Sequence, residues 1–415
     1  MRRRICAVLA VAVVLFCGAA ALAAPVQRVH QIQKPLLSDA AIVKAGGSFS
    51  IECKLADGES GLAAYLTSPD DPTVRVELKL LPKAGPAYEA QVPADVKPGL
   101  YDLSMRFTDY DWDLQPHAVK VVKEIKDEFD FIQFTDIHFN HQYISNLDMN
   151  RIRRKVLQDM SKEDVEFAIF SGDLGLDPET YDADYVYGYE EFVRFMKLPM
   201  YMVPGNHEQY YTKAGDYEID GRQYWEAAYG PTFRSFDYGK LHVIGMNSYD
   251  WIRAWRDRRS KDVMFFGTVV NAMIAPAQWD WAKKDMEDAK SRGQGIVAFT
   301  HIPVETLQGG KTIGVPPNRA KVPGPDTKTF CETLVADGVQ YLFVGHMHYN
   351  EEKTLFGLKE VLTKSTGIGG GHPYRWGYRI IHVKDGKVTG WKMHDIGLTD
   401  IGEPERKAGE GKERD

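Results

Sequence analysis

Residues 129–138 read Phe-Asp-Phe-Ile-Gln-Phe-Thr-Asp-Ile-His, an apolar run that ends on the carboxylate of Asp136 and the imidazole of His138. A short apolar run bounded by polar residues is typical of a buried strand. Similar runs, each followed by Asp, Asn or His, occur within residues 167–173, 200–208, 296–301 and 341–348. Buried strands whose ends all carry these side chains predict a dinuclear metal site.

From Phe129 onward, such strands alternate with segments of helical periodicity. These segments cover residues 150–162, 190–197 and 276–293. Strands that are apolar on both faces, with helices between them, indicate a sheet buried beneath helices. Ligands in such folds bind at the carboxyl ends of the strands, where all the polar motifs lie. We therefore predict an α/β catalytic domain over residues 128–400.

In residues 36–124, by contrast, apolar residues recur at every second position. Apolar and polar side chains alternate in residues 49–55, 74–80 and 101–107, with turn clusters between them. This pattern predicts half-buried antiparallel strands and a small all-β sandwich of immunoglobulin or fibronectin type. The sandwich either contacts a cell surface or glycan, or narrows access to the active site, or only packs on the catalytic domain. The last interpretation is the simplest, because a fold alone does not specify a function.

The two ends of the chain have distinct compositions. Arg2, Arg3 and Arg4 precede an apolar run that ends on small residues, which predicts a signal peptide over residues 1–23, cleaved near Ala23. We therefore expect an exported protein, in the periplasm, at the cell surface or outside the cell; a retained signal anchor is the alternative. Residues 403–415 are highly charged and are predicted to be disordered.

The net charge limits the possible binding partners, and the cysteine content limits the possible disulfide bonds. The net charge of -7 does not favour a nucleic-acid polymer or a polybasic membrane contact. Beyond the predicted signal peptide, the cysteines are Cys53 and Cys331. Cys53 lies on the apolar side of a predicted strand, which favours a buried thiol, although an exported protein also permits an interdomain disulfide.

The side chains at the strand ends indicate the kind of metal. They are carboxylates, imidazoles and an amide, without cysteine. This set favours a catalytic site with Mn, Fe or Zn over a structural zinc site. Two metals held roughly 3.5–4 Å apart clamp both the entering and the leaving oxygen of a phosphoryl group. One carboxylate must bridge them, and Asp173 is the candidate.

Taken together, Asp136-x-His138, Gly172-Asp173, Gly205-Asn206-His207-Glu208, His301 and Gly345-His346-x-His348 resemble the signature of the calcineurin-like metallophosphoesterase superfamily over residues 129–396. The resemblance implies a four-layer αββα sandwich. It implies that Asp136, His138, Asp173 and His348 hold a first divalent metal. It also implies that Asp173, Asn206, His301 and His346 hold a second.

The same resemblance implies an activity. A hydroxide between the metals would attack phosphorus in line, and His207 would stabilise the phosphoryl oxygens or protonate the leaving group. Candidate contacts to a small phosphate-ester substrate are Asn206, His207, Lys311, Arg319 and His372. His141 is a further candidate for a supporting or substrate contact.

The sequence departs from the pattern after the Gly-Asp motif. Leu176 stands where many members carry Asp, Asn or, in purple acid phosphatases, Tyr. No tyrosinate ligand is therefore expected, and Asp177 is the candidate to orient His207. The complete ligand set favours a phosphomonoesterase or phosphodiesterase. A non-catalytic protein that binds phosphate or a phosphopolymer through the same site and the β-sandwich is the alternative.

Overall fold

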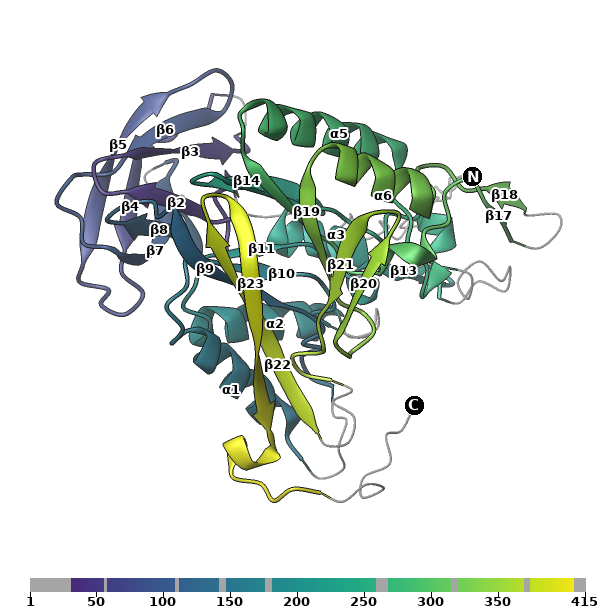
Figure 1. The fold of residues 1–415 in the computed structure, drawn as a ribbon. Coiled ribbons are helices and arrows are strands. Elements are labelled where there is room, and N and C mark those ends of the chain that lie inside the picture. Colours follow the sequence, from purple (N-terminus) through teal and green to yellow (C-terminus); the bar gives the residue numbers. More distant parts are fainter. Residues whose placement is uncertain are drawn as a thin grey trace, which may run out of the picture.

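The computed structural model describes residues 31–55, 58–108, 112–141, 147–175, 181–258, 268–314, 319–368 and 374–406. The predicted signal peptide lies outside these ranges, as do residues 407–415 of the charged tail. The chain has a mixed α/β fold that is rich in strands and has few helices (Figure 1). Among the described residues, no helix is long and apolar enough to cross a membrane.

In the ranges that the structure describes, the regular elements of the N-terminal part are all strands. They are β1 (Ile32–Lys34), β2 (Ala41–Lys44), β3 (Ser48–Cys53), β4 (Ala63–Thr67), β5 (Arg75–Pro82), β6 (Ala87–Gln91), β7 (Gly99–Arg106) and β8 (Trp112–Val122), in the order β1-β3-β6-β5-β4-β7-β8-β2. The first half of β5 pairs with β4 and its second half with β6. Alternate residues of β3, β4 and β7, such as Ile51, Leu66 and Leu103, share one core. We call this part the β-lobe.

Most of the remaining strands form two further sheets. One has the order β11 (Met200–Met202), β10 (Ala168–Phe170), β9 (Glu128–Phe134), β22 (Arg375–Lys384) and β23 (Lys387–Gly397). The other has the order β14 (Arg234–Tyr238), β15 (Leu241–Gly245), β16 (Gly295–Phe299), β19 (Val339–Val344), β21 (Leu358–Leu362) and β20 (Glu351–Leu355). Strands β9, β10 and β11 are parallel to one another, as are β15, β16, β19 and β21. All the strands predicted to carry ligands are therefore present.

The helices and short elements complete the fold. The helices are α1 (Met149–Met160), α2 (Tyr181–Phe195), α3 (Gly221–Tyr229), α5 (Pro276–Ser291) and α6 (Thr327–Ala336). Two small hairpins are β12 (Tyr211–Ala214) with β13 (Tyr217–Asp220), and β17 (Thr312–Ile313) with β18 (Ala320–Lys321). Single turns of helix are η2 (His207–Gln209), η3 (Arg253–Trp255), η4 (Val304–Thr306) and η5 (Leu398–Ile401).

Local sequence explains where the predicted helices begin. Asp148 caps α1 by accepting from the Asn150 N–H, and Pro276 occupies the first turn of α5, where its missing N–H costs nothing. The helix predicted at residues 190–197 is the second half of the longer α2.

Three apolar cores hold the two sheets and the helices together. One lies between the five-stranded sheet and α1, α2 and α3, and includes Phe134, Val156 and Phe192. Another lies between the two sheets and includes Phe131 and Phe299. The third joins the six-stranded sheet to α5 and α6. Figure 1 shows α1 and α2 on one side of the molecule, and α5 and α6 on the other.

The segment before β2 joins the β-lobe to the five-stranded sheet. The Met202 N–H donates to the Ser38 carbonyl at 3.0 Å, and the Ala40 N–H to the Met200 carbonyl at 3.3 Å. Leu37 is buried in the same core as α1 and α2. This pairing covers the edge of β11, which would otherwise expose unpaired backbone groups.

Both cysteines of the described chain are free and buried. Burial raises the pKa of the Cys53 and Cys331 thiols to about 12. Neither thiol is therefore activated for reaction near neutral pH.

Candidate metal centre

The loops after β9, β10, β16 and β19 bring the predicted ligands other than Asn206 together, because parallel strands end at the same edge of a sheet. The Asp136 N–H donates to the Gly172 carbonyl at 2.9 Å, and the Gly345 N–H to the His301 carbonyl at 2.9 Å. Across the two sheets, the His346 N–H donates to Asp136 Oδ2 at 2.9 Å. The four loops thus form one hydrogen-bonded unit.

Most of the ligand residues have an unusual backbone conformation. The φ angles are 54° at Asp136, 43° at His138, 61° at Asp173, 73° at His346 and 60° at His348. Left-handed backbone at a residue other than glycine costs about 1–3 kcal/mol and is concentrated at functional sites. The fold therefore gives up stability to direct these side chains toward one another.

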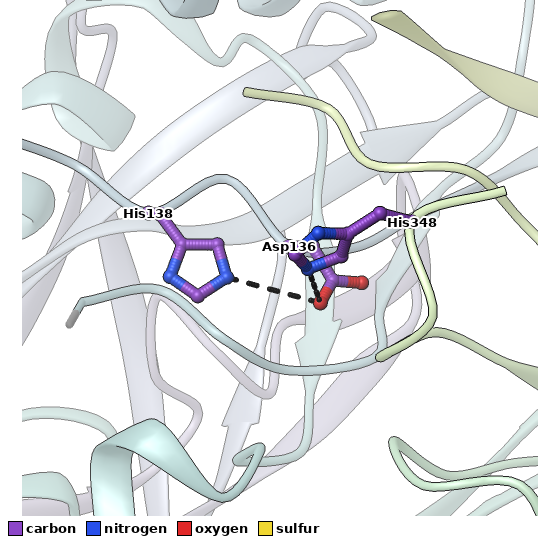
Figure 2. A group of neighbouring side chains, drawn as sticks. All are labelled: Asp136, His138 and His348. Carbon is purple, nitrogen blue, oxygen red and sulfur yellow. Dashed lines mark hydrogen bonds and ion pairs between the residues drawn. The ribbon is translucent and has the colours of Figure 1, made fainter. Parts of the chain in front are cut away.

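Asp136, His138 and His348 form the first group of neighbouring donors. In Figure 2, dashed lines run from both rings to the same oxygen of the Asp136 carboxylate. His348 Nε2 lies 3.1 Å and His138 Nε2 3.8 Å from this Oδ1. His138 Nδ1 lies 2.9 Å from the Gly175 carbonyl oxygen, which directs Nε2 into the site. In the part of the chain that the structure describes, Nε2 is buried without a hydrogen-bond partner, as a nitrogen that binds a metal must be.

Asp173, His301 and His346 form a second group. His301 Nε2 lies 3.0 Å from Asp173 Oδ2 and 3.2 Å from His346 Nδ1. Asn206 Oδ1 is 3.0 Å from the same His301 nitrogen, and Asn206 Nδ2 donates to the Tyr210 hydroxyl at 2.6 Å, which fixes the amide with its oxygen toward the site. These oxygen and nitrogen donors fit a divalent Mn, Fe or Zn ion.

Asp173 also belongs to a third group, with His138 and His207. Its Oδ2 lies 3.5 Å from His138 Nε2 and 4.0 Å from His207 Nε2. The Asp173 carboxylate is thus shared by the second and third groups, and His138 is shared by the first and third. Within this third group, the His207 side chain is 26% exposed, whereas the Asp173 side chain is 2% exposed. In the first group, the His348 side chain is also 26% exposed.

The charges of the site are strongly coupled. Burial opposes ionisation of Asp136, but His348 and His301 hold the pKa of this carboxyl well below its usual range. Burial also opposes protonation of His301, but Asp173 and Asp136 raise its pKa to about 9. Burial lowers the pKa of His138 to about 4 and that of His346 to about 3. Those two rings are neutral at pH 7, the form in which histidine binds a metal.

Glycines allow the loops to approach closely. A Cβ on Gly205 would lie 2.0 Å from Asp173 Oδ1. One on Gly172, where φ is 99°, would lie 2.5 Å from the Gly205 nitrogen. A larger residue at position 205 would therefore displace the Asp173 carboxylate, and one at position 172 would press on the Gly205 backbone and the His301 ring.

Other predicted contacts fall outside this unit. Lys311 is exposed at the end of the β17–β18 hairpin, and Arg319 is exposed beside it. Among the described residues, neither contacts a predicted ligand. His141 is partly buried near the His138 loop, and burial lowers its pKa to about 4. His372, Leu176 and Asp177 lie outside the residues that the structure describes.

Glu208 lies within a ligand motif, yet the sequence alone assigns it no role. This buried carboxylate accepts N–H bonds from Asp173 at 2.9 Å, Leu174 at 2.6 Å, Gly175 at 3.0 Å and Gly205 at 2.7 Å. It therefore ties the Gly-Asp loop to the Asn-His loop. Burial and the charge of Asp173 raise the pKa of Glu208 to about 7.

Arg153 is a second residue that sequence reasoning missed. Its buried guanidinium donates to the carbonyls of Ile137 at 2.7 Å, His141 at 2.6 Å and Gly367 at 3.0 Å. It thus joins α1 to the loop that carries Asp136 and His138. The available signal was its position on the buried side of α1, beside Ile152 and Val156.

Comparison with known proteins identifies the family of the chain. The family model described as calcineurin-like phosphoesterase matches residues 129–350. Among solved structures, a purple acid phosphatase, PPD1, from yellow lupin (Lupinus luteus) seeds is 13% identical with a TM-score of 0.44, over 85% of this chain and 72% of that chain. A dimetal phosphatase from Danio rerio is 13% identical with a TM-score of 0.46, over 65% of this chain and 98% of that one. A search of curated proteins found no match. Because the family model spans more than half of the sequence and contains all the ligand motifs, the chain belongs to the calcineurin-like phosphoesterase family.

Proposed function

We propose that the chain is a metal-dependent phosphoesterase that hydrolyses phosphomonoester or phosphodiester bonds at a dinuclear centre. The observation that carries this proposal is the position of Asp173, whose buried carboxylate belongs to two groups of donors. Within each group, the donor atoms lie within 4.8 Å of one another. A single carboxylate between two sets of histidines is what two adjacent cations require.

The residues divide into two sets around that carboxylate. Asp136, His138 and His348 would hold one ion together with Asp173. Asn206, His301 and His346 would hold the other. When bound, two divalent ions supply a water that is deprotonated near neutral pH and positive charge for the entering and the leaving oxygens.

His207 would act on the substrate directly. Its backbone N–H donates to Asp173 Oδ1 at 3.1 Å, so its position is fixed by the shared carboxylate. Its ring lies 5.0 Å from that of His138 and is partly exposed, which supports a direct contact with an entering phosphoryl group. From there it can donate a hydrogen bond to a phosphoryl oxygen, or a proton to the departing alkoxide.

The wider assignments form part of the same proposal. The three apolar cores support a four-layer αββα catalytic domain over residues 128–400. The single core of the β-lobe supports an immunoglobulin-like sandwich over residues 36–124. Arg2 to Arg4 and the apolar run that follows support export. A small phosphate ester as substrate, without a nucleic-acid polymer, agrees with the net charge of -7.

The test is hydrolysis by the chain expressed without residues 1–23. The enzyme would be assayed on p-nitrophenyl phosphate and bis-p-nitrophenyl phosphate after chelation, and again after Mn, Fe or Zn is added back. We expect chelation to abolish hydrolysis and a metal to restore it. Tight phosphate binding without turnover under any metal would contradict the proposal and favour the non-catalytic alternative.

A further inference from the structure

A cavity of about 620 Å³ lies between the β-lobe and α2. Asp102 of β7 and Trp112 and Leu114 of β8 line it from the β-lobe, and Tyr189 and Val193 line it from α2. Among the described residues of the lining, none is a predicted metal ligand. The volume falls within the range of about 300–1,000 Å³ that is typical of small-molecule sites. The cavity is therefore a candidate binding site separate from the metal centre.

Part of the wall is aromatic and accessible. Trp112 is 45% exposed and Leu114 is 49% exposed, and both side chains lie on one face of β8 because successive residues alternate. The Trp112 ring centroid lies 5.5 Å from that of Tyr65, and the guanidinium carbons of Arg75 and Arg106 are each 5.8 Å from the Trp112 ring. Neither arginine is among the described residues of the lining. The indole is thus held by its neighbours, and its π-system already attracts positive charge.

Two carboxylates of the lining are held by backbone donors. Asp113 Oδ2 accepts the Ile32 N–H at 2.7 Å, and Asp102 Oδ1 accepts the His117 N–H at 2.8 Å. These N–H groups orient the carboxylates but leave their negative charge in place. Asp113 is buried, and burial raises the pKa of the Asp102 carboxyl. Carboxylates in such surroundings are stabilised by a positive group nearby.

The cations closest to these carboxylates already have partners. Arg194, which lines the cavity, lies 3.1 Å from Glu190 of the same lining. Lys197 acts on Asp102 from outside the described lining, and its Nζ is 3.7 Å from Asp70. The described lining therefore has an excess of negative charge. An anionic ligand would be repelled there, and a purely apolar ligand would leave the carboxylates without compensation.

We propose that this cavity binds a ligand through an organic ammonium group, which contacts the Trp112 ring and the carboxylates of Asp102 and Asp113. A quaternary or primary ammonium group satisfies both kinds of wall, because it pairs with carboxylates and is attracted to the face of an aromatic ring. The cavity is larger than an ammonium group alone, so the rest of the ligand would lie against Leu114 and Val193. The inference does not depend on the metal centre, and it stands or falls separately from the proposed hydrolysis.

Two probes of the same shape test the role of the charge. They are choline and the neutral dimethylbutanol in which a carbon atom replaces the ammonium nitrogen. Both would be titrated into the purified chain, with binding followed by NMR of the ligand. One variant carries Asp102→Asn and Asp113→Asn, which keep an oxygen acceptor for each backbone N–H group. A second variant carries Trp112→Leu.

The matched control for the double variant carries Asp95→Asn and Asp280→Asn. Both of these carboxylates are exposed, and neither belongs to the described lining of the cavity. The control therefore removes the same number of negative charges from the chain without changing the cavity. Circular dichroism would show whether each variant is folded. Because Trp112 is exposed, its replacement tests the site even if the double variant does not fold.

We expect the parent to bind choline about tenfold more tightly than the neutral alcohol, since both the ring and the carboxylates favour the cation. The preference should fall below about threefold in the double variant and persist in the control. Trp112→Leu should weaken choline binding about fivefold. A parent that binds both probes equally, or neither, would overturn the inference. Choline binding that is unchanged in Trp112→Leu, or a control that loses as much preference as the double variant, would also overturn it.

Discussion

The metal centre and the surroundings of His242 use the same residue types for different ends. His301 Nε2 lies 3.0 Å from Asp173, and His242 Nε2 lies 2.8 Å from Asp285. In both cases burial opposes the charged imidazole, but neighbouring carboxylates raise its pKa to about 9. By distance and pKa alone, the two sites look alike.

They differ in how many donor atoms face one point. Each ring nitrogen of His242 has its own carboxylate, because Nδ1 lies 2.6 Å from Asp237. In that arrangement, each N–H group of a protonated His242 has its own carboxylate acceptor. In the metal centre, more imidazoles than carboxylates converge, and His138 Nε2 has no hydrogen-bond partner within the described residues. We infer that a metal site is distinguished from a structural ion pair by ring nitrogens that outnumber their carboxylate partners. A raised histidine pKa does not distinguish the two.

The largest effect is expected at the shared carboxylate. Asp173→Asn removes the negative charge that both donor groups use, and should lower kcat/KM by about 1,000-fold, on the order of 4 kcal/mol of transition-state stabilisation. Metal content by mass spectrometry and hydrolysis of p-nitrophenyl phosphate would measure the change. If the Asp173→Asn variant kept both its metal content and its activity, Asp173 would not be a metal ligand. The site would then not differ from the ion pairs around His242.

Glu208→Gln should give the next largest effect. An amide in place of the carboxylate turns an NH₂ group toward backbone N–H donors of the ligand loops, so metal affinity should fall about 10–100-fold. Glu360→Gln is the matched control, because burial also raises the pKa of Glu360 to about 7 and it accepts the Val304 N–H at 2.8 Å. The control should lose stability but keep its metal affinity, as measured by competition with a chelator.

Arg153→Lys should have a smaller effect. Lysine cannot reproduce the fork that reaches three carbonyl groups, so the His138 loop should loosen and kcat/KM should fall about tenfold. Arg234→Lys is the comparison, because Arg234 is also buried and donates to the carbonyls of Tyr229 at 3.1 Å and Pro231 at 2.6 Å. Equal losses of activity in the two variants would show that Arg153 acts only through general stability.

The substitution His242→Gln should leave activity unchanged and affect stability only. The folded-state pKa of about 9 lies above the unfolded value of 6.5. The folded state therefore holds the proton more tightly, and the stabilisation, roughly 2–3 kcal/mol, is complete below pH 6.5 and is lost as pH rises through about 9. Urea unfolding of parent and variant at pH 6.5 and pH 9.5 would measure it. A difference that grows with pH would contradict this account.

Much of the centre could be predicted because its signals are local. Each ligand follows an apolar strand directly, so the strand ends by themselves locate Asp136, Asp173 and His301. The resemblance then divides the ligands between two metals. The position of α1 is equally accessible, since its cap and apolar stripe are adjacent in sequence.

What could not be predicted depends on contacts between distant segments. Arg153 contacts Gly367, which is 214 residues away, and no local pattern reports such a pairing. The burial of Leu37 against the catalytic helices is of the same kind. Lys311 and Arg319 are candidates only because of their charge and their position in a long loop. The composition of that loop does not predict the direction in which the β17–β18 hairpin extends.

The most direct test of the central claim is anomalous X-ray scattering from crystals of the metal-loaded chain. The account predicts two peaks roughly 3.5–4 Å apart, one on each side of the Asp173 carboxylate, with none near His242. A single peak, or two peaks that do not share Asp173, would contradict it.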